Sequence, residues 1–198
     1  ARIAKAPTRS TSRRDRRAST EASISQAPAR LTPGVRSTGP LVIAFAVVEV
    51  RVETAEHAVP GGAVTLLGAV HGVTGAMTRV ELEGARVLVD AGVAQGADAH
   101  SWSLPDAAHR VSAVVLTHAH NDHVGSLPAI LSRGFSGPIY GTPATLSIAR
   151  LVLVDAMRLG DVPAGERVRV LSRFDAAVRP VPYDRPFDVH PNVTAFFR

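Results

Sequence analysis

The sequence predicts a layered α/β (α+β) domain. Short strand-like segments come first along the chain, and amphipathic helical segments follow them. Between the two lies the segment 111–117 (VSAVVLT), which is apolar throughout, as expected for a strand buried on both faces. With 198 residues and 45% hydrophobic content, the chain is long enough to bury a core and too apolar to be disordered throughout.

The positive charge of the chain is concentrated at its amino end. Residues 1–40 hold nine basic and two acidic residues, a net charge of +7, and show no apolar periodicity. They are predicted to be a disordered tail rich in Arg, Ser and Pro. Residues 41–198 hold 13 basic and 15 acidic residues, a net charge of −2, and are predicted to form the domain. The sequence pI of 10.8 is therefore no evidence that the domain binds nucleic acid.

Composition also limits the cellular setting. The chain has no cysteine, which excludes disulfide frameworks and thiolate metal sites. The pair Arg13-Arg14 is followed by charged residues, and the apolar run Leu41–Val48 begins more than twenty residues later, unlike an export signal. That run is also far short of the ~20 residues of a spanning helix. We therefore expect a cytoplasmic protein with no membrane partner.

Four segments before the central strand are typical of β-structure. Residues 78–83 alternate, with Val80 and Leu82 on one side and charged side chains on the other, which predicts a half-buried strand. Gly84 provides the turn into the following strand. The four predicted strands are Leu41–Val52 (an edge strand), Val64–Val70, Thr78–Glu83 and Arg86–Asp90.

Three helices are predicted after the central strand. Val124–Arg133 has helical apolar spacing and is stopped by Gly134. Thr142 is a good N-cap before Pro143, which predicts a helix through Leu159. Glu166–Val178 repeats Val168, Leu171, Phe174 and Val178 as a further apolar stripe. Residues 180–197 are interrupted by prolines and predict short strands.

One motif carries chemistry: His118-Ala119-His120-Asn121-Asp122-His123, directly after the buried strand. Histidines two residues apart in an extended loop point to the same side and can bind one metal ion. The Asp122-His123 pair that follows can reach a second ion. Imidazole nitrogen and carboxylate oxygen are ordinary zinc ligands. A solvated histidine cluster is the non-functional alternative.

This motif resembles the HxHxDH signature of the metallo-β-lactamase superfamily. Three further segments resemble its β-CASP branch of RNA-processing exonucleases and endonucleases: Val64–Met77 (VTLLGAVHGVTGAM), Leu88–Gly96 (LVDAGVAQG) and Gly137–Leu151 (GPIYGTPATLSIARL). The resemblance implies the amino-terminal part of a four-layer αββα sandwich. It implies a hydrolase that binds two Zn²⁺ ions and cleaves RNA phosphodiester bonds with a bridging water.

Carried over residue by residue, the resemblance implies that His118 and His120 bind one zinc ion and that Asp122 and His123 bind the other. Asp90 would support the site from just outside the ligands; a turn-capping role is the alternative. The loop Gly72–Gly75 would lie near the site. No residue is identified as a substrate-binding or catalytic residue beyond these positions.

The family's later ligand motifs and its inserted cleft domain are not found in this sequence. Two ligands per ion are fewer than the three of catalytic zinc sites, so we expect weak metal affinity and impaired hydrolysis in this chain. An incomplete sandwich would expose an apolar sheet face, which favours self-association or pairing with a complementing carboxyl-terminal half. Two alternatives stay open: another hydrolase of the same fold, such as a glyoxalase II-like thioesterase, or a truncated, non-catalytic remnant.

Overall fold

A computed structural model describes residues 54–96, 99 and 102–198. The predicted tail and the predicted strand Leu41–Val52 lie outside these residues. In chain order the elements are β1 (Ala55–Val59), β2 (Gly62–Gly68), β3 (Met77–Leu82), β4 (Ala85–Val89), the 3₁₀ turn η2 (Asp106–Ala108), β5 (Ala113–Val115), α1 (Asn121–Val124), α2 (Leu127–Ser132), β6 (Ile139–Gly141), α3 (Pro143–Leu159), α4 (Ala164–Ala177), β7 (Val178–Pro180), β8 (Phe187–His190) and β9 (Val193–Ala195).

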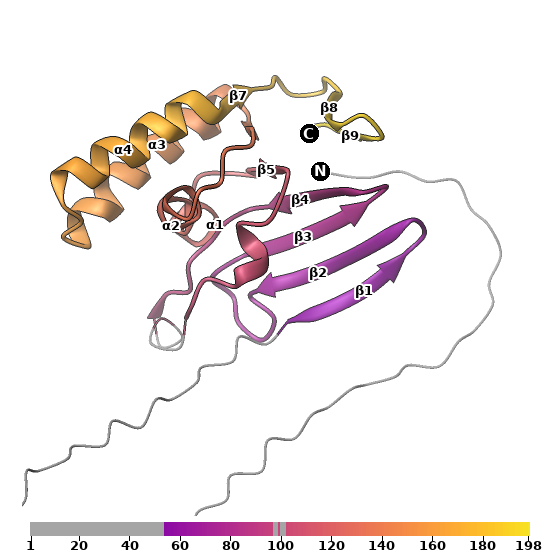
Figure 1. The fold of residues 1–198 in the computed structure, drawn as a ribbon, viewed down its shortest axis with the longest axis horizontal. Coiled ribbons are helices and arrows are strands. Elements are labelled where there is room, and N and C mark those ends of the chain that lie inside the picture. Colours follow the sequence, from indigo (N-terminus) through magenta and orange to yellow (C-terminus); the bar gives the residue numbers. More distant parts are fainter. Residues whose placement is uncertain (1–53, 97–98, 100–101) are drawn as a thin grey trace, which may run out of the picture. The chain divides into compact units, whose positions relative to one another are not determined.

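A seven-stranded sheet follows the order of the chain, from β1 at one edge to β7 at the other (Figure 1). Strands β1 to β4 are antiparallel, and β4 to β7 are parallel. Val80 of β3 lies opposite Val64 of β2 on one side and opposite Val87 of β4 on the other. The expected layered α/β fold is therefore confirmed, and β5 is fully buried, although it is shorter than the predicted segment 111–117, in which Ser112 and Thr117 are exposed.

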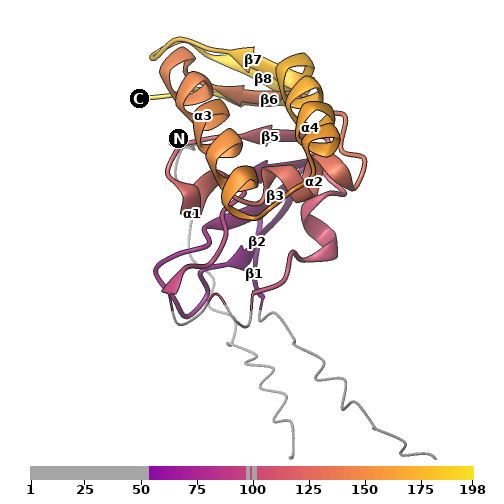
Figure 2. The same ribbon diagram turned by 90° about the vertical axis from the view of Figure 1, so that its left-hand side faces the viewer.

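Helices α3 and α4 cover one face of the parallel strands (Figure 2). Leu88, Val114 and Ile139 project into this layer from β4, β5 and β6 and are fully buried. Helix α3 has the predicted bounds because Thr142 caps it: its Oγ1 accepts a hydrogen bond from the Thr145 amide at 3.1 Å.

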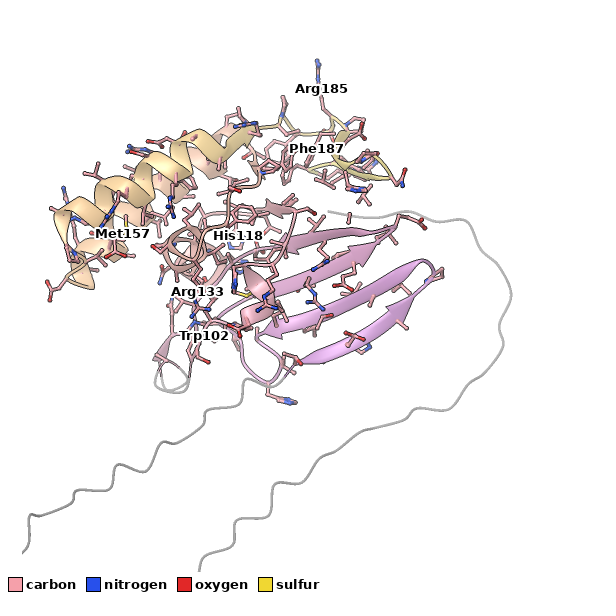
Figure 3. All side chains as sticks on the ribbon, viewed as in Figure 1. Trp102, His118, Arg133, Met157, Arg185 and Phe187 are labelled. Carbon is pink, nitrogen blue, oxygen red and sulfur yellow. The ribbon has the colours of Figure 1, made fainter. Side chains whose placement is uncertain are left out.

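The opposite face is partly covered by the β8–β9 hairpin. Val87 and Val115 of the sheet pack there against Val189, Val193 and Phe197. Figure 3 labels Met157 in the helical layer and Phe187 in the hairpin, one residue from each core. The expectation of a bare second face is therefore corrected: the apolar residues of 187–197 form a two-stranded sheet that covers part of it.

The predicted helix Val124–Arg133 is wrong as a single element. The structure divides it into α1 and α2, with Gly125 and Ser126 between them. The break has a local cause, because the Ser126 amide donates to the Ala91 carbonyl and its hydroxyl donates to the Gly92 carbonyl at 2.6 Å. The helix is thus interrupted at Ser126, which is hydrogen-bonded to the loop that follows β4.

The predicted apolar stripe of α4 is also partly wrong. Val168 is 62% exposed, whereas Val170, Phe174 and Ala177 are buried. The buried residues are spaced by four and three, the interval that keeps side chains on one helix face. Val178, assigned to the helix from the sequence, begins β7.

No helix in the described ranges is both long and apolar enough to cross a lipid bilayer.

Candidate metal centre

The predicted site residues come from two loops at the carboxyl ends of neighbouring parallel strands. Asp90 directly follows β4, and residues 116–120 connect β5 to α1. Since β4 and β5 are parallel and adjacent, both loops leave the same edge of the sheet. Crevices at this edge are the usual location of ligand sites in open α/β sheets.

Asp90 is a buried carboxylate with three hydrogen-bond partners. It is 5% exposed and has a backbone φ of +60°, a conformation that Asp tolerates better than most residues. Its Oδ1 accepts from the Thr117 amide at 2.8 Å, and its Oδ2 accepts from the Thr117 hydroxyl at 2.7 Å. The third partner is Nδ1 of His123, at 2.8 Å from Oδ2.

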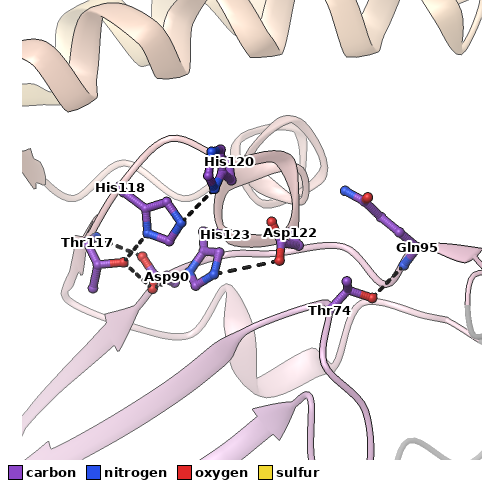
Figure 4. Close-up of polar contacts among 8 residues, drawn as sticks. All are labelled: Thr74, Asp90, Gln95, Thr117, His118, His120, Asp122 and His123. Carbon is purple, nitrogen blue, oxygen red and sulfur yellow. Dashed lines mark hydrogen bonds and ion pairs between the residues drawn. The ribbon is translucent and has the colours of Figure 1, made fainter.

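The Asp90–His123 contact fixes the state of the imidazole. An ionised carboxylate only accepts hydrogen bonds, so Nδ1 of His123 must carry the proton. In the neutral imidazole the lone pair is then on Nε2, which lies 3.8 Å from Oδ2 of Asp122 (Figure 4). Asp122 and His123 are thereby brought together as one pair of donors.

His118 is oriented by the same network. Because Thr117 uses its single hydroxyl proton on Asp90, Oγ1 can only accept from Nδ1 of His118, which lies 3.0 Å away. The lone pair of His118 is therefore on Nε2, which lies 3.1 Å from Nδ1 of His120. Burial lowers the pKa of His118, and the neighbouring His123 lowers it further, which favours the neutral imidazole that metals bind.

The main chain ties this loop to its neighbours. The Ala76 amide donates to the Asp122 carbonyl at 2.8 Å, and the Ala91 amide donates to the His123 carbonyl at 2.7 Å. Gly92 packs so closely that an added Cβ would overlap the Asp122 carbonyl oxygen. The loop Gly72–Gly75, which ends at Ala76, is thus next to the motif, as expected.

The donor set fits zinc-type metals in its chemistry. Two ligands on one tetrahedral zinc, each at ~2.0–2.1 Å, lie about 3.3 Å apart, close to the 3.1 Å between the His118 and His120 nitrogens. In the second pair, Nε2 of His123 and Oδ2 of Asp122 are farther apart, at 3.8 Å. In the described part of the chain, no group of three or more His, Asp or Glu side chains is placed to hold one metal ion. The residues therefore fit as pairs of ligands.

The structure brings together all five residues identified from the sequence: Asp90, His118, His120, Asp122 and His123. The sequence analysis missed Thr117, which connects Asp90 to His118. The only signal for it was a hydroxyl side chain between the buried strand and the first histidine. It also missed Gly92 and Ser126, whose roles depend on tertiary contacts.

The sequence profile described as "Metallo-beta-lactamase superfamily" matches residues 70–193. "Ribonuclease TTHA0252" of Thermus thermophilus is 42% identical over 98 residues, which are 48% of this chain and 23% of the relative. "Transcription termination factor FttA" of Cenarchaeum symbiosum is 36% identical over 118 residues, 54% of this chain and 18% of the relative.

"Ribonuclease J" of Mycolicibacterium smegmatis is 36% identical over 101 residues, 46% of this chain and 18% of the relative. The chain thus spans about a quarter or less of the length of these relatives.

Proposed function

The chain belongs to the metallo-β-lactamase superfamily, and from this premise we propose that its site serves metal-dependent hydrolysis of phosphodiester bonds in RNA. Superfamily membership implies metal ions, and we propose that they are Zn²⁺. Two relatives that carry the name ribonuclease support RNA as the substrate class. The motifs that resemble the RNA-processing branch point the same way.

The observation that carries the proposal is the Asp90–Thr117–His118 network. The Thr117 and Asp90 contacts place a proton on Nδ1 of His118 and of His123, so the neutral form of each ring has on Nε2 the lone pair that can bind metal. In zinc sites, a carboxylate on the far nitrogen of a ligand histidine orients the ring and raises its basicity. A solvated histidine cluster would not need a buried carboxylate held by three hydrogen bonds.

We assign His118 and His120 to one ion and Asp122 and His123 to the other. When bound, the two ions would supply Lewis acidity, which lowers the pKa of a water molecule and offsets negative charge on the phosphoryl oxygens. Asp90 holds the proton on Nδ1 of His123, and Thr117 holds the proton on Nδ1 of His118. The loops from β2 and β4 fix the backbone beneath Asp122.

The described residues provide two donors for each ion, whereas catalytic zinc usually has three protein ligands. We propose that efficient turnover needs donors beyond this set, from a second copy of the chain or from a complementing segment. The isolated chain is then expected to bind metal weakly and to hydrolyse RNA slowly.

Metal binding tests the proposal directly. Calorimetric titration of the full chain with Zn²⁺, and Co²⁺ absorption spectra, should show binding that is lost in His118→Ala and His120→Ala. His57→Ala, at an exposed histidine of β1, is the control. Zn²⁺ affinity that is equal in all three variants would contradict the assignment. Cleavage of thioesters, but not of RNA, by the metal-loaded chain would contradict the substrate class.

A further inference from the structure

A hollow with two arginines lies at the opposite edge of the parallel strands. The segment 134–138 leads into β6, and Arg173 and Arg179 lie near the junction of α4 and β7. Helix α4 lies beside α2 over this edge (Figure 2). The hollow measures ≈ 340 Å³ and lies between residues 134–138 on one side and Arg173, Ala176, Ala177 and Arg179 on the other.

Both arginines donate hydrogen bonds to main-chain carbonyls but form no ion pair with a described carboxylate. Nη1 of Arg173 donates to the Leu131 carbonyl at 2.6 Å, and Nη1 of Arg179 donates to the carbonyls of Ala176 and Val178. Within the described residues neither arginine has an ion pair, and the residues that line the hollow include no carboxylate. Nε and Nη2 of each guanidinium are therefore available to a ligand.

The loop adds backbone donors. The amides of Ser136 and Gly137 make no hydrogen bond to another described residue. Gly137 packs so tightly against the Ser112 carbonyl that a Cβ there would overlap it, which holds the loop in place. Residues that line one hollow thus carry two guanidinium groups without an ion pair and two amides without a described partner, a donor set suited to a phosphate group.

We propose that this hollow binds a backbone phosphodiester of single-stranded RNA and so holds the polymer away from the metal centre. The choice of RNA as the ligand of this hollow rests on the proposed function. The hollow lies at the amino ends of β6 and β7, and the metal centre lies at the carboxyl ends of β4 and β5. It therefore retains polymeric substrate without touching the bond that is cleaved.

Further arginines lie next to this hollow, but carboxylates accompany them. Exposed Arg169 lines an adjoining hollow together with Arg173, and Arg133 lines another beside α2. Glu166 also lines both of these adjoining hollows, and Asp106 pairs with Arg133 at 3.6 Å, so the positive surface is strongest at Arg173 and Arg179.

Binding of a fluorescent oligouridylate to the full chain, in the presence of EDTA, tests the proposal without using the metal centre. The double variant R173A/R179A should bind about tenfold more weakly. The slope of log K against log[salt] should fall by about 0.7 for each arginine removed. The matched control, R158A/R185A, removes the same charge at exposed sites outside the hollow and should bind like wild type.

A second variant avoids any loss of stability from the arginine anchors. Ser136→Asp places a carboxylate at an exposed position in the wall of the hollow and should weaken binding similarly, whereas S103D at another exposed serine should not. Equal binding by S136D and wild type would overturn the proposal. Competition by inorganic phosphate or uridine monophosphate as strong as that by the oligomer would show a small-anion site and would also overturn it.

Photo-cross-linking separates the hollow from the basic tail. With 4-thiouridine in the oligomer, cross-links should map to residues 134–138 or 173–179. Cross-links confined to residues 1–40 would overturn the proposal. If the histidine variants bind zinc like wild type while RNA binding follows the arginines, the proposed reaction fails and the phosphate site stands. If the histidine variants lose zinc binding while RNA binding is unchanged in the arginine variant, the proposed reaction stands and the phosphate site is excluded.

Discussion

Oδ2 of Asp90 lies 2.8 Å from Nδ1 of His123, a residue 33 positions later in the chain. The same oxygen accepts the Thr117 hydroxyl, so one carboxylate oxygen orients residues at both ends of the histidine loop.

Replacement of Asp90 by Asn should weaken Zn²⁺ binding by about 10–100-fold, because a neutral amide holds the His123 proton less strongly than a carboxylate. Competition with a chromogenic chelator would measure the loss. Asp155→Asn, at an exposed position of α3, is the matched control. An unchanged affinity in D90N would show that the contact is only structural.

Thr117→Val removes the hydroxyl but keeps the shape of the side chain. It removes one protein partner each from Nδ1 of His118 and from Asp90, and because Thr117 is exposed to water the unfolding free energy should fall by about 0.5–1.5 kcal/mol. Zn²⁺ affinity should fall as well, because the His118 tautomer is no longer fixed. Thr117→Ser keeps the hydroxyl and should restore both. Urea denaturation and metal titration measure the two effects, and a serine variant as weak as the valine variant would argue against the hydroxyl.

Gly92→Ala should destabilise the domain by about 2 kcal/mol or more, because the added methyl group overlaps the Asp122 carbonyl oxygen. Gly165→Ala is the matched control: it lies in α4 with open space around the added methyl group. There the change should stabilise the helix by about 0.5–1 kcal/mol. Thermal unfolding of both variants tests the comparison, and equal shifts in Tm would contradict it.

Phe174→Ala should cost about 3–5 kcal/mol of unfolding free energy, because the ring is 1% exposed and packs in the helical layer. Val168→Ala should cost less than about 0.5 kcal/mol, because its side chain is 62% exposed. The apolar stripe expected from the sequence treats both positions as core. Similar losses of unfolding free energy in both variants would support the predicted stripe and would contradict the observed exposure of Val168.

The sequence predicted those elements whose signals are local. Thr142 and Pro143 define the start of α3, and the uninterrupted apolar run of β5 indicates its burial. Four of the five site residues were identified because three histidines and an aspartate occupy six consecutive positions, and Asp90 was identified from the resemblance of Leu88–Gly96 to the family. The break at Ser126 was not visible, because its cause is a bond to Gly92, 34 residues earlier.

The same limit applies to Thr117 and to the hairpin. Thr117 gains its role only when Asp90 is brought beside it by the pairing of β4 with β5. The hairpin strands β8 and β9 were expected, but not their cover of the sheet, because that contact depends on which face of the sheet Val189 and Val193 meet.

The strand order from β1 to β7 matches the chain order, so each strand from β2 to β7 pairs with the one made just before it. During synthesis on a ribosome, each strand would emerge beside a partner that is already available, with only short loops or single crossovers to close. The sheet can therefore grow stepwise from its amino-terminal edge. Asp90 is synthesised before the histidines that it orients, so the carboxylate is present when the metal-binding loop first forms.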